Sequence, residues 1–164
     1  MIKNVKWIFV VLIISSLISF SFVGKNTPTE GLTIGDKAPT FTICGEKQLI
    51  DLKDLRGKYV LLSFWASYDA LSRMQNATLN HAVAQADNVE MVSVSFDEYK
   101  SIFNETIKKD QISTSNCFVE LAGVSSYLYQ TYRLKRGFKN FLLDENGVIV
   151  AKDVTVSELS SYLN

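Results

Sequence analysis

Apolar and polar positions follow two different periods along this chain, and the change of period separates strands from helices. Residues 59–66, YVLLSFWA, are apolar at nearly every position, which in so short a run fits a strand buried on both faces. Residues 89–96, VEMVSVSF, form a second, β-branched run of the same kind. Between them, residues 69–86 carry Leu71 and Met74 among several apolar positions at helical spacing. The pattern therefore predicts strand, helix and strand, in the order of a βαβ unit.

The rest of the chain predicts three more helices and two β-hairpins. The strongest local signal is Asn146-Gly147, a dipeptide that favours the tight turn between antiparallel strands. A βαβ unit followed by a helix, a hairpin and a last helix is the order of a thioredoxin fold, an α/β class with a central mixed sheet flanked by helices. The predicted hairpins pair 40–44 with 48–52 and lie within 139–154, and the predicted helices span 97–110, 125–134 and 155–164.

The start of the chain has the layout of a secretory signal. Lys3 and Lys6 precede an uncharged, largely apolar run from Trp7 to Val23, which is typical of a signal peptide. The run also approaches the length of a short membrane span, so cleaved and anchored forms both remain open. We expect a signal peptide or membrane anchor at 1–24, a polar linker at 25–34 and one domain at 35–164.

Composition and charge exclude several classes of function. The chain of 164 residues is 47% hydrophobic and 21% charged, as a globular domain is. Its 17 basic and 17 acidic residues are interspersed without a basic stripe, so nothing indicates nucleic-acid binding. One histidine, His81, and two separate cysteines cannot compose a metal site, and no Gly-rich phosphate loop occurs. We therefore expect no metal and no cofactor.

Four segments of the chain carry a known family pattern. They are IGDKAPTFTI, IDLKDLRGKYVLLSFWAS, MVSVSFDE and NFLLDENGVIVAKDV, in this order. Together they resemble the exported thioredoxin-like proteins of the TlpA type and the related redoxins. The resemblance implies a thioredoxin fold and a bacterial thiol-disulfide oxidoreductase, often tethered to the outer face of the cytoplasmic membrane. It implies that this protein lies in the periplasm, either free or anchored in the membrane.

The redox motif of that family is altered here. After FWAS the family continues with an aromatic residue, Cys, two variable residues, Cys and Arg, whereas residues 68–73 of this chain read YDALSR. The aromatic residue and the arginine are in register, so Asp69 and Ser72 stand in place of the two cysteines. Disulfide exchange needs a thiolate, which neither residue supplies. We expect no catalytic residue here, and we expect Asp69 to cap the following helix.

A second family landmark is missing as well. The family places a cis-proline in the loop before the FLLD-like strand, against the redox motif, and this chain has Phe138 there. A cis bond before a non-proline residue costs about 2.5 to 4 kcal/mol, so we expect a trans bond and a reshaped loop. With both cysteines also absent, the surface is expected to persist only for binding. Its predicted contact residues are Trp65, Tyr68, Asp69, Ala70, Leu71, Ser72, Phe138 and Lys139.

The two cysteines that remain lie elsewhere. Cys44 ends the first predicted strand, and Cys117 lies between two predicted helices. Neither belongs to a Cys-x-x-Cys motif or to a cluster of basic residues, which favours two small, partly buried apolar residues. A structural disulfide between them, or a redox pair remote from the usual site, is the alternative in an oxidising compartment.

Three tyrosines in the predicted helix 125–134 allow two interpretations. Tyr127, Tyr129 and Tyr132 fall close together and could form an aromatic patch for a partner. More often such residues pack a helix onto a sheet and keep their hydroxyl groups at the rim. We expect packing.

The sequence therefore favours one function and leaves two open. The leading hypothesis is an exported thioredoxin-like domain that acts as a binding or accessory module, with an unknown envelope protein or peptide as its partner. The rival is a divergent thiol-disulfide oxidoreductase or redoxin that uses Cys44, Cys117 or both. The third is a folded remnant with a purely structural role.

Overall fold

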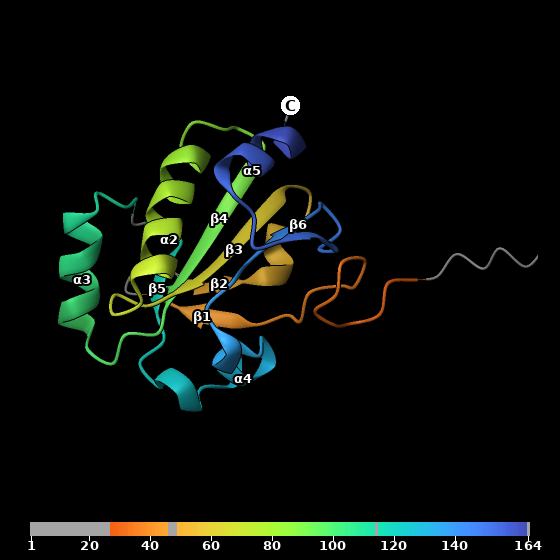
Figure 1. The fold of residues 1–164 in the computed structure, drawn as a ribbon. Helices are drawn as coiled ribbons and strands as arrows, with labels where there is room; N and C mark the ends of the chain where they lie inside the picture. The colour runs from red at the N-terminus through yellow and green to blue at the C-terminus, as the bar shows by residue number, and fades with distance from the viewer. Residues whose placement is uncertain (1–26, 46–48, 114, 164) are drawn as a thin grey trace, which may run out of the picture.

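A computed structural model of the chain describes residues 27–45, 49–113 and 115–163 (Figure 1). The predicted leader, 1–24, lies outside the described residues, as do residues 46–48 of the first hairpin. None of the described helices has the length and apolarity needed to cross a membrane. In chain order the elements are β1 Thr42–Cys44, β2 Leu49–Asp51, η1 Leu52–Leu55, β3 Tyr59–Trp65, α2 Ala70–Val83, β4 Val89–Ser95, α3 Lys100–Lys109, β5 Cys117–Val119, η2 Gly123–Ser125, α4 Tyr127–Thr131, η3 Leu134–Arg136, β6 Asn140–Leu143, β7 Ile149–Lys152 and α5 Val156–Leu163.

A mixed sheet of five strands forms the centre of the molecule, in the order β5-β4-β3-β6-β7. Strands β3, β4 and β5 run parallel, whereas β6 and β7 are each antiparallel to their neighbours. The N-terminal hairpin β1-β2 forms a separate two-stranded sheet. The predicted α/β class, with a central mixed sheet flanked by helices and an N-terminal hairpin, is confirmed.

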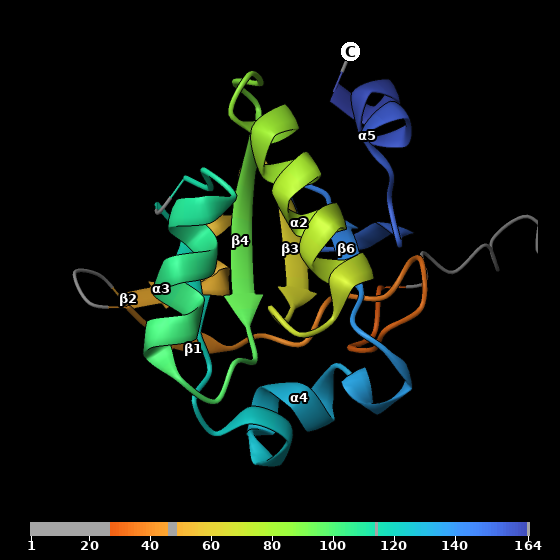
Figure 2. The ribbon, with the colours of Figure 1, turned by 60° about the vertical axis from the view of Figure 1, so that its left-hand side comes forward.

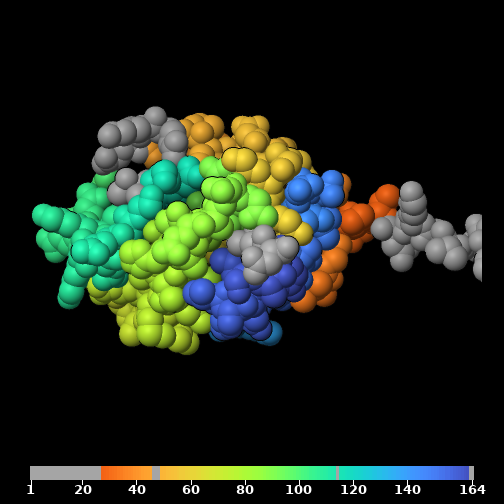
Figure 3. Space-filling view, turned by 90° about the horizontal axis from the view of Figure 1, so that it is seen from above, coloured from red at the N-terminus to blue at the C-terminus, as the bar shows by residue number. Residues whose placement is uncertain are grey.

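Alternate residues of β3 pack on opposite faces of the sheet. Leu61 belongs to a core with α2 and α5, and Trp65 packs with α3. On the other face, Leu62 and Phe64 pack against the hairpin and α4. Figure 2 shows α2 in front of the sheet, with α3 beside β4 and the hairpin β1-β2 behind α3, and Figure 3 shows α2 and α5 side by side. Because both faces are covered, β3 is apolar at nearly every position.

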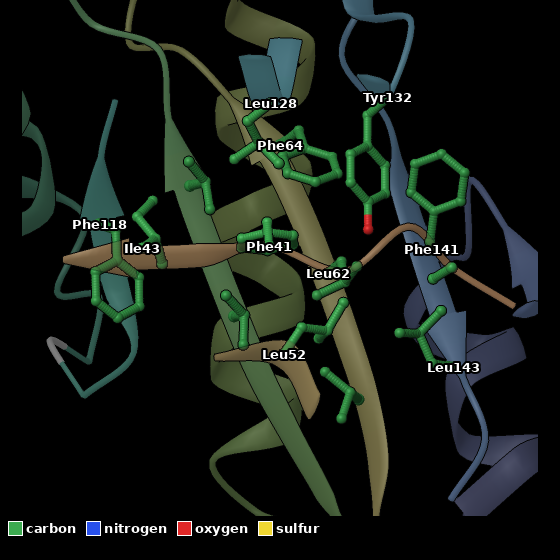
Figure 4. Packing of buried hydrophobic residues seen from close by; sticks show 14 of the residues in the cluster. Phe41, Ile43, Leu52, Leu62, Phe64, Phe118, Leu128, Tyr132, Phe141 and Leu143 are labelled. Carbon is green, nitrogen blue, oxygen red and sulfur yellow. The ribbon is translucent and has the colours of Figure 1, made fainter. Parts of the chain in front are cut away.

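The core on the hairpin side is rich in aromatic rings (Figure 4). The ring of Tyr132 lies 4.6 Å from that of Phe64 and 5.9 Å from that of Phe41. Its hydroxyl donates to the Pro39 carbonyl at 2.7 Å. Tyr132 is therefore buried, as predicted, although its hydroxyl lies inside the core and not at the rim. Tyr127 is 73% exposed, so the predicted packing is wrong for this residue.

Two elements differ from the prediction. The helix predicted at 125–134 is shorter, because Arg133 adopts a left-handed φ of 54° and ends α4. The short strand β5, Cys117–Val119, was not predicted; it extends the parallel part of the sheet beside β4.

The segment 29–38 lies along the outer edge of β7. Gly35 donates its backbone N–H to the Ile149 carbonyl at 2.9 Å, and the N–H of Ile149 donates to the Asp36 carbonyl at 2.8 Å. The Thr29 carbonyl accepts from the N–H of Lys37 at 2.8 Å. Among the described residues, Thr29 and Gly31 of the predicted linker 25–34 thus form hydrogen bonds with the segment that follows.

Candidate functional site

The junction between β3 and α2 is built around a helix cap. Asp69 has an extended backbone with φ −97°, and its carboxylate accepts a hydrogen bond from the Ser72 backbone N–H at 2.8 Å. The Ser72 hydroxyl in turn donates to the Asp69 carbonyl at 3.2 Å. The predicted capping role of Asp69 is confirmed. Asp69 and Ser72, which the sequence resemblance assigned to the family's cysteine positions, are thus joined by hydrogen bonds that begin a helix.

The predicted contact residues differ in how much of them reaches the surface. Tyr68 and Leu71 are 68% and 62% exposed, and Ala70 is exposed as well. Asp69, Phe138 and Lys139 are partly buried, and Ser72 is buried.

Trp65, which was predicted to belong to this surface, is fully buried. Its side chain lies on the helix face of the sheet, where Nε1 donates to the Ser93 hydroxyl at 2.8 Å and the ring packs near Phe103 of α3. Because no part of Trp65 reaches solvent, it supports the site from beneath and contacts no partner directly.

Phe138 brings the loop before β6 against the same junction. Its ring lies 6.2 Å from that of Tyr68, stacks on Phe96 at 5.8 Å and meets Tyr129 edge-on at 6.4 Å. The peptide bond before Phe138 is trans, as expected. We call Tyr68, Phe96, Tyr129 and Phe138 the aromatic cluster. It joins the two parts of the predicted contact surface, residues 68–72 and the loop of Phe138, and includes two residues, Phe96 and Tyr129, that the site prediction left out.

A buried carboxylate ties the junction to β4. Asp97 is 2% exposed, and its Oδ1 accepts from the Ser67 backbone N–H at 2.9 Å and from the Ser67 hydroxyl at 2.6 Å. Its Oδ2 accepts from the Ser95 hydroxyl at 2.6 Å. Sequence analysis missed this network. The available signal was the polar residue at every second position of an apolar run, at Ser93, Ser95 and Asp97.

The arginine of the altered motif joins α2 to the end of α3. Arg73 donates from Nε and Nη2 to the two carboxylate oxygens of Asp110, both at 2.7 Å. This hydrogen bonding lowers the pKa of Asp110 below its ordinary value. An open groove of about 470 Å³ runs beside the pair. Its other lining residues are Ser67, Ala70, Met74, Ala77 and Thr78.

Cys117 lies in a buried polar network on the helix face. The Ser93 hydroxyl, which accepts from Trp65, donates to Asn76 Oδ1 at 2.8 Å. Burial raises the pKa of Cys117 to about 11, although a hydrogen bond with Ser93 acts in the opposite direction. A thiol in this setting stays protonated at neutral pH, so it is a weak nucleophile.

The two cysteines are free thiols. Ile43 and Phe118 belong to the same core cluster and lie near each other in Figure 4. Cys44 follows Ile43 and Cys117 precedes Phe118, so alternation along each strand turns both thiols away from that shared core. Cys44 is exposed, whereas Cys117 is mostly buried on the other side of the sheet. The suggested Cys44–Cys117 disulfide is therefore absent.

Metal-ligating side chains do not gather in the part of the chain that the structure describes: no group of three or more His, Cys, Asp or Glu residues could hold an ion. His81 is an exposed residue of α2.

Comparison with known proteins gives concordant matches. The model of the AhpC/TSA family matches residues 34–152. The thiol-disulfide oxidoreductase ResA of a Bacillus cereus strain is 25% identical over 163 residues, which cover 95% of this chain and 92% of that protein. A thioredoxin-like protein from Parabacteroides distasonis is 41% identical, with a TM-score of 0.73 over 84% of this chain and 98% of that chain. A thiol-disulfide oxidoreductase from Bacteroides fragilis is 29% identical, with a TM-score of 0.64 over 78% and 97% of the two chains.

Proposed function

The chain belongs to the AhpC/TSA family, in its thioredoxin-like, TlpA-type group, and we propose that within this family it is a binding or accessory module without disulfide oxidoreductase activity. The observation that carries the proposal is the pair Asp69 and Ser72 at the positions of the family cysteines. The Asp69 carboxylate is engaged by the Ser72 N–H at 2.8 Å. A carboxylate and a hydroxyl cannot form the mixed disulfide through which thiol exchange proceeds.

The remaining thiols give little support to a rival redox site. Burial of Cys117 raises its pKa to about 11, which keeps the thiolate fraction very small near neutral pH. Cys44 is exposed but has no second cysteine beside it to resolve a mixed disulfide. A redox cycle between Cys44 and Cys117 would require β1 or β5 to exchange the side chains that face the core for those that face away from it.

The surface that replaces the redox site has the features of a binding site. Tyr68 and Leu71 are largely exposed, while Phe138 and Tyr129 are held by ring contacts to Phe96. Large rigid side chains contribute contact area at a low cost in conformational entropy. The Ser67–Asp97 hydrogen bonds hold the loop that carries Tyr68, so the surface is preorganised.

We place this module outside the cytoplasm, in the periplasm or anchored facing it. The support is the sequence of residues 1–24, in which Lys3 and Lys6 precede the apolar run. The partner proposed for it is accordingly a protein or peptide of the cell envelope.

An insulin reduction assay tests the proposal. Purified protein is incubated with dithiothreitol and insulin, and precipitation of the reduced insulin chains is followed by turbidity. We expect the rate of the uncatalysed control. Variants Cys44→Ser and Cys117→Ser are measured in parallel, since thiol-dependent turnover that either substitution abolishes would establish the rival redoxin and overturn the non-catalytic module.

A further inference from the structure

Three loops lie side by side at one end of the sheet, the end at which β3 and β4 finish and β6 starts. Because β4, β3 and β6 are neighbours in that order, the loop after β4 and the loop before β6 flank the loop after β3. Asp97 and Glu98 belong to the first, Tyr68 and Asp69 to the middle one, and Phe138 to the last. The exposed ring of Tyr68 is therefore at the centre of this end.

Negative charge gathers on the β4 side of Tyr68. Asp69 follows it in the chain, and Asp97 is hydrogen-bonded to Ser67, directly before it. The hydrogen bonds that hold the Asp97 carboxylate come from neutral serine donors. The Arg73 guanidinium also interacts with it electrostatically, but Arg73 is paired with Asp110. Glu98 is exposed.

Basic residues also occur at this end. Lys100 opens α3 on the β4 side, and Lys139 lies on the β6 side, next to Phe138. Asp69, Asp97 and Glu98 outnumber Lys100 on the β4 side of Tyr68, and the charge of Arg73 is offset by its ion pair with Asp110. Partial burial is the largest cause that raises the pKa of the Tyr68 phenol, and the negative charges of Asp97, Asp69 and Glu98 raise it further. This effect agrees with three carboxylates near the Tyr68 ring.

The open groove along α2, which Asp110 borders just after α3, begins at the same place. Ser67 and Ala70, which flank the Tyr68–Asp69 turn, line it together with Met74 and Ala77. Small side chains leave the space, and a methionine adapts to different apolar shapes. Arg73 and Asp110 neutralise each other at its wall, so the groove suits an uncharged side chain.

Resting on the proposed binding function, we propose that the occupant of this surface is an extended segment of a partner protein with a lysine or arginine two residues from an apolar side chain. The cation lies over the ring of Tyr68, between Asp69 and Glu98, and the apolar side chain enters the groove along α2. Residues i and i+2 of an extended chain share one face, which allows both contacts at once. A tyrosine face attracts a cation, and the carboxylates add charge complementarity.

Binding of three defined peptides tests the proposal. The probes are acetyl-Gly-Ser-Lys-Ser-Leu-Ser-Gly-amide and its Lys→Gln and Lys→Glu versions, titrated into ¹⁵N-labelled full-length protein while the amide signals of residues 67–70 are followed by NMR. We expect the lysine peptide to bind about tenfold more tightly than the glutamate peptide. Added salt should reduce this difference. Equal affinities, or no shift of these signals with any peptide, would overturn the cation preference.

Charge-removing variants assign the effect to residues. Asp69→Asn keeps a good helix cap while removing the charge, and combined with Glu98→Gln it should reduce the preference for the lysine peptide over the glutamine peptide, because only the Tyr68 ring and Asp97 then attract the cation. Asp54→Asn, on the exposed surface of η1, is the matched control and should change nothing. A preference of undiminished size in the double variant would refute the assignment. If the three peptides bind the parent protein equally and Phe138→Ala weakens all of them, the binding function stands and the cation preference alone fails.

Discussion

The Asp69 carboxylate and the Ser72 backbone N–H, 2.8 Å apart, connect the two positions at which the TlpA-type group has its cysteines. In a redox-active relative, the first turn of the helix stabilises a thiolate with its unpaired N–H groups and its dipole. Here the same N–H is satisfied by a carboxylate. The helix N-terminus, which would lower the pKa of a thiol at this position, is capped by the Asp69 carboxylate in this protein.

Restoring both sulfurs should restore exchange chemistry. We expect Asp69→Cys with Ser72→Cys, made in a Cys44→Ser, Cys117→Ser background, to reduce insulin above the uncatalysed rate, because the new first cysteine would lie at a helix N-terminus. Each single cysteine variant should show no catalytic turnover, since a resolving thiol is missing. A folded double variant with reactive thiols and no turnover would show that the Phe138 loop also blocks the reaction.

Removing the cap should destabilise the domain. Asp69→Ala leaves the Ser72 N–H without its acceptor, and we expect the free energy of unfolding to fall by about 1 kcal/mol. Asp69→Asn, which can accept the same bond, should stay within a few tenths of the parent value. Urea unfolding followed by circular dichroism measures both variants. Equal losses for alanine and asparagine would mean that charge, and not capping, is the contribution of Asp69.

The Arg73–Asp110 pair should make stability depend on pH in the acid range. Its hydrogen bonds lower the pKa of Asp110 in the folded state, so the contribution is complete above the unfolded value of about 3.9 and is lost as pH falls through the lower folded value. We expect Asp110→Asn to lose roughly 1 kcal/mol at pH 7. The gap between variant and parent should shrink as pH falls below about 4. An unchanged gap in urea unfolding at acid pH would contradict this.

The two thiols should differ sharply in reactivity. Cys44 is exposed, whereas burial raises the pKa of Cys117 to about 11. We expect iodoacetamide at mildly alkaline pH to label Cys44 in the native protein and Cys117 only after unfolding in guanidinium. Mass spectrometry of peptides gives the site of each label. Fast native labelling of Cys117 would reopen a redox role for it, and an unreduced mass two protons short would reveal a disulfide.

The fold could be predicted where each element has its own pattern. The runs at β3 and β4 and the Asn146-Gly147 turn are local signals, and Asp69 is a typical N-cap residue. β5 could not be predicted, because its three residues gain their structure from pairing with β4. Nor could the end of α4, since a left-handed φ at Arg133 is rare for a residue of this type.

The site residues that belong to the family pattern were predicted from the sequence, whereas those that the fold brings beside them were missed. Asp69, Ser72 and Phe138 follow from the family pattern. Phe96 lies 5.8 Å from Phe138 and completes the aromatic cluster, a contact that depends on the order of strands. Trp65 illustrates the opposite error, because it precedes the exposed loop in sequence while its side chain lies under the helices.

The segment 29–38 also covers one end of the outer strand β7 and so hinders pairing of this strand with a second copy of the protein. β7 is the last strand of the sheet, and a bare outer strand is a template for pairing with another chain. Gly35 and Asp36 occupy the backbone groups of Ile149 that would make such pairing possible. Processing of the N-terminus that stops before Thr29 keeps these bonds, whereas a fragment that begins after Ala38 would leave the Ile149 end of β7 open to pairing with a second copy.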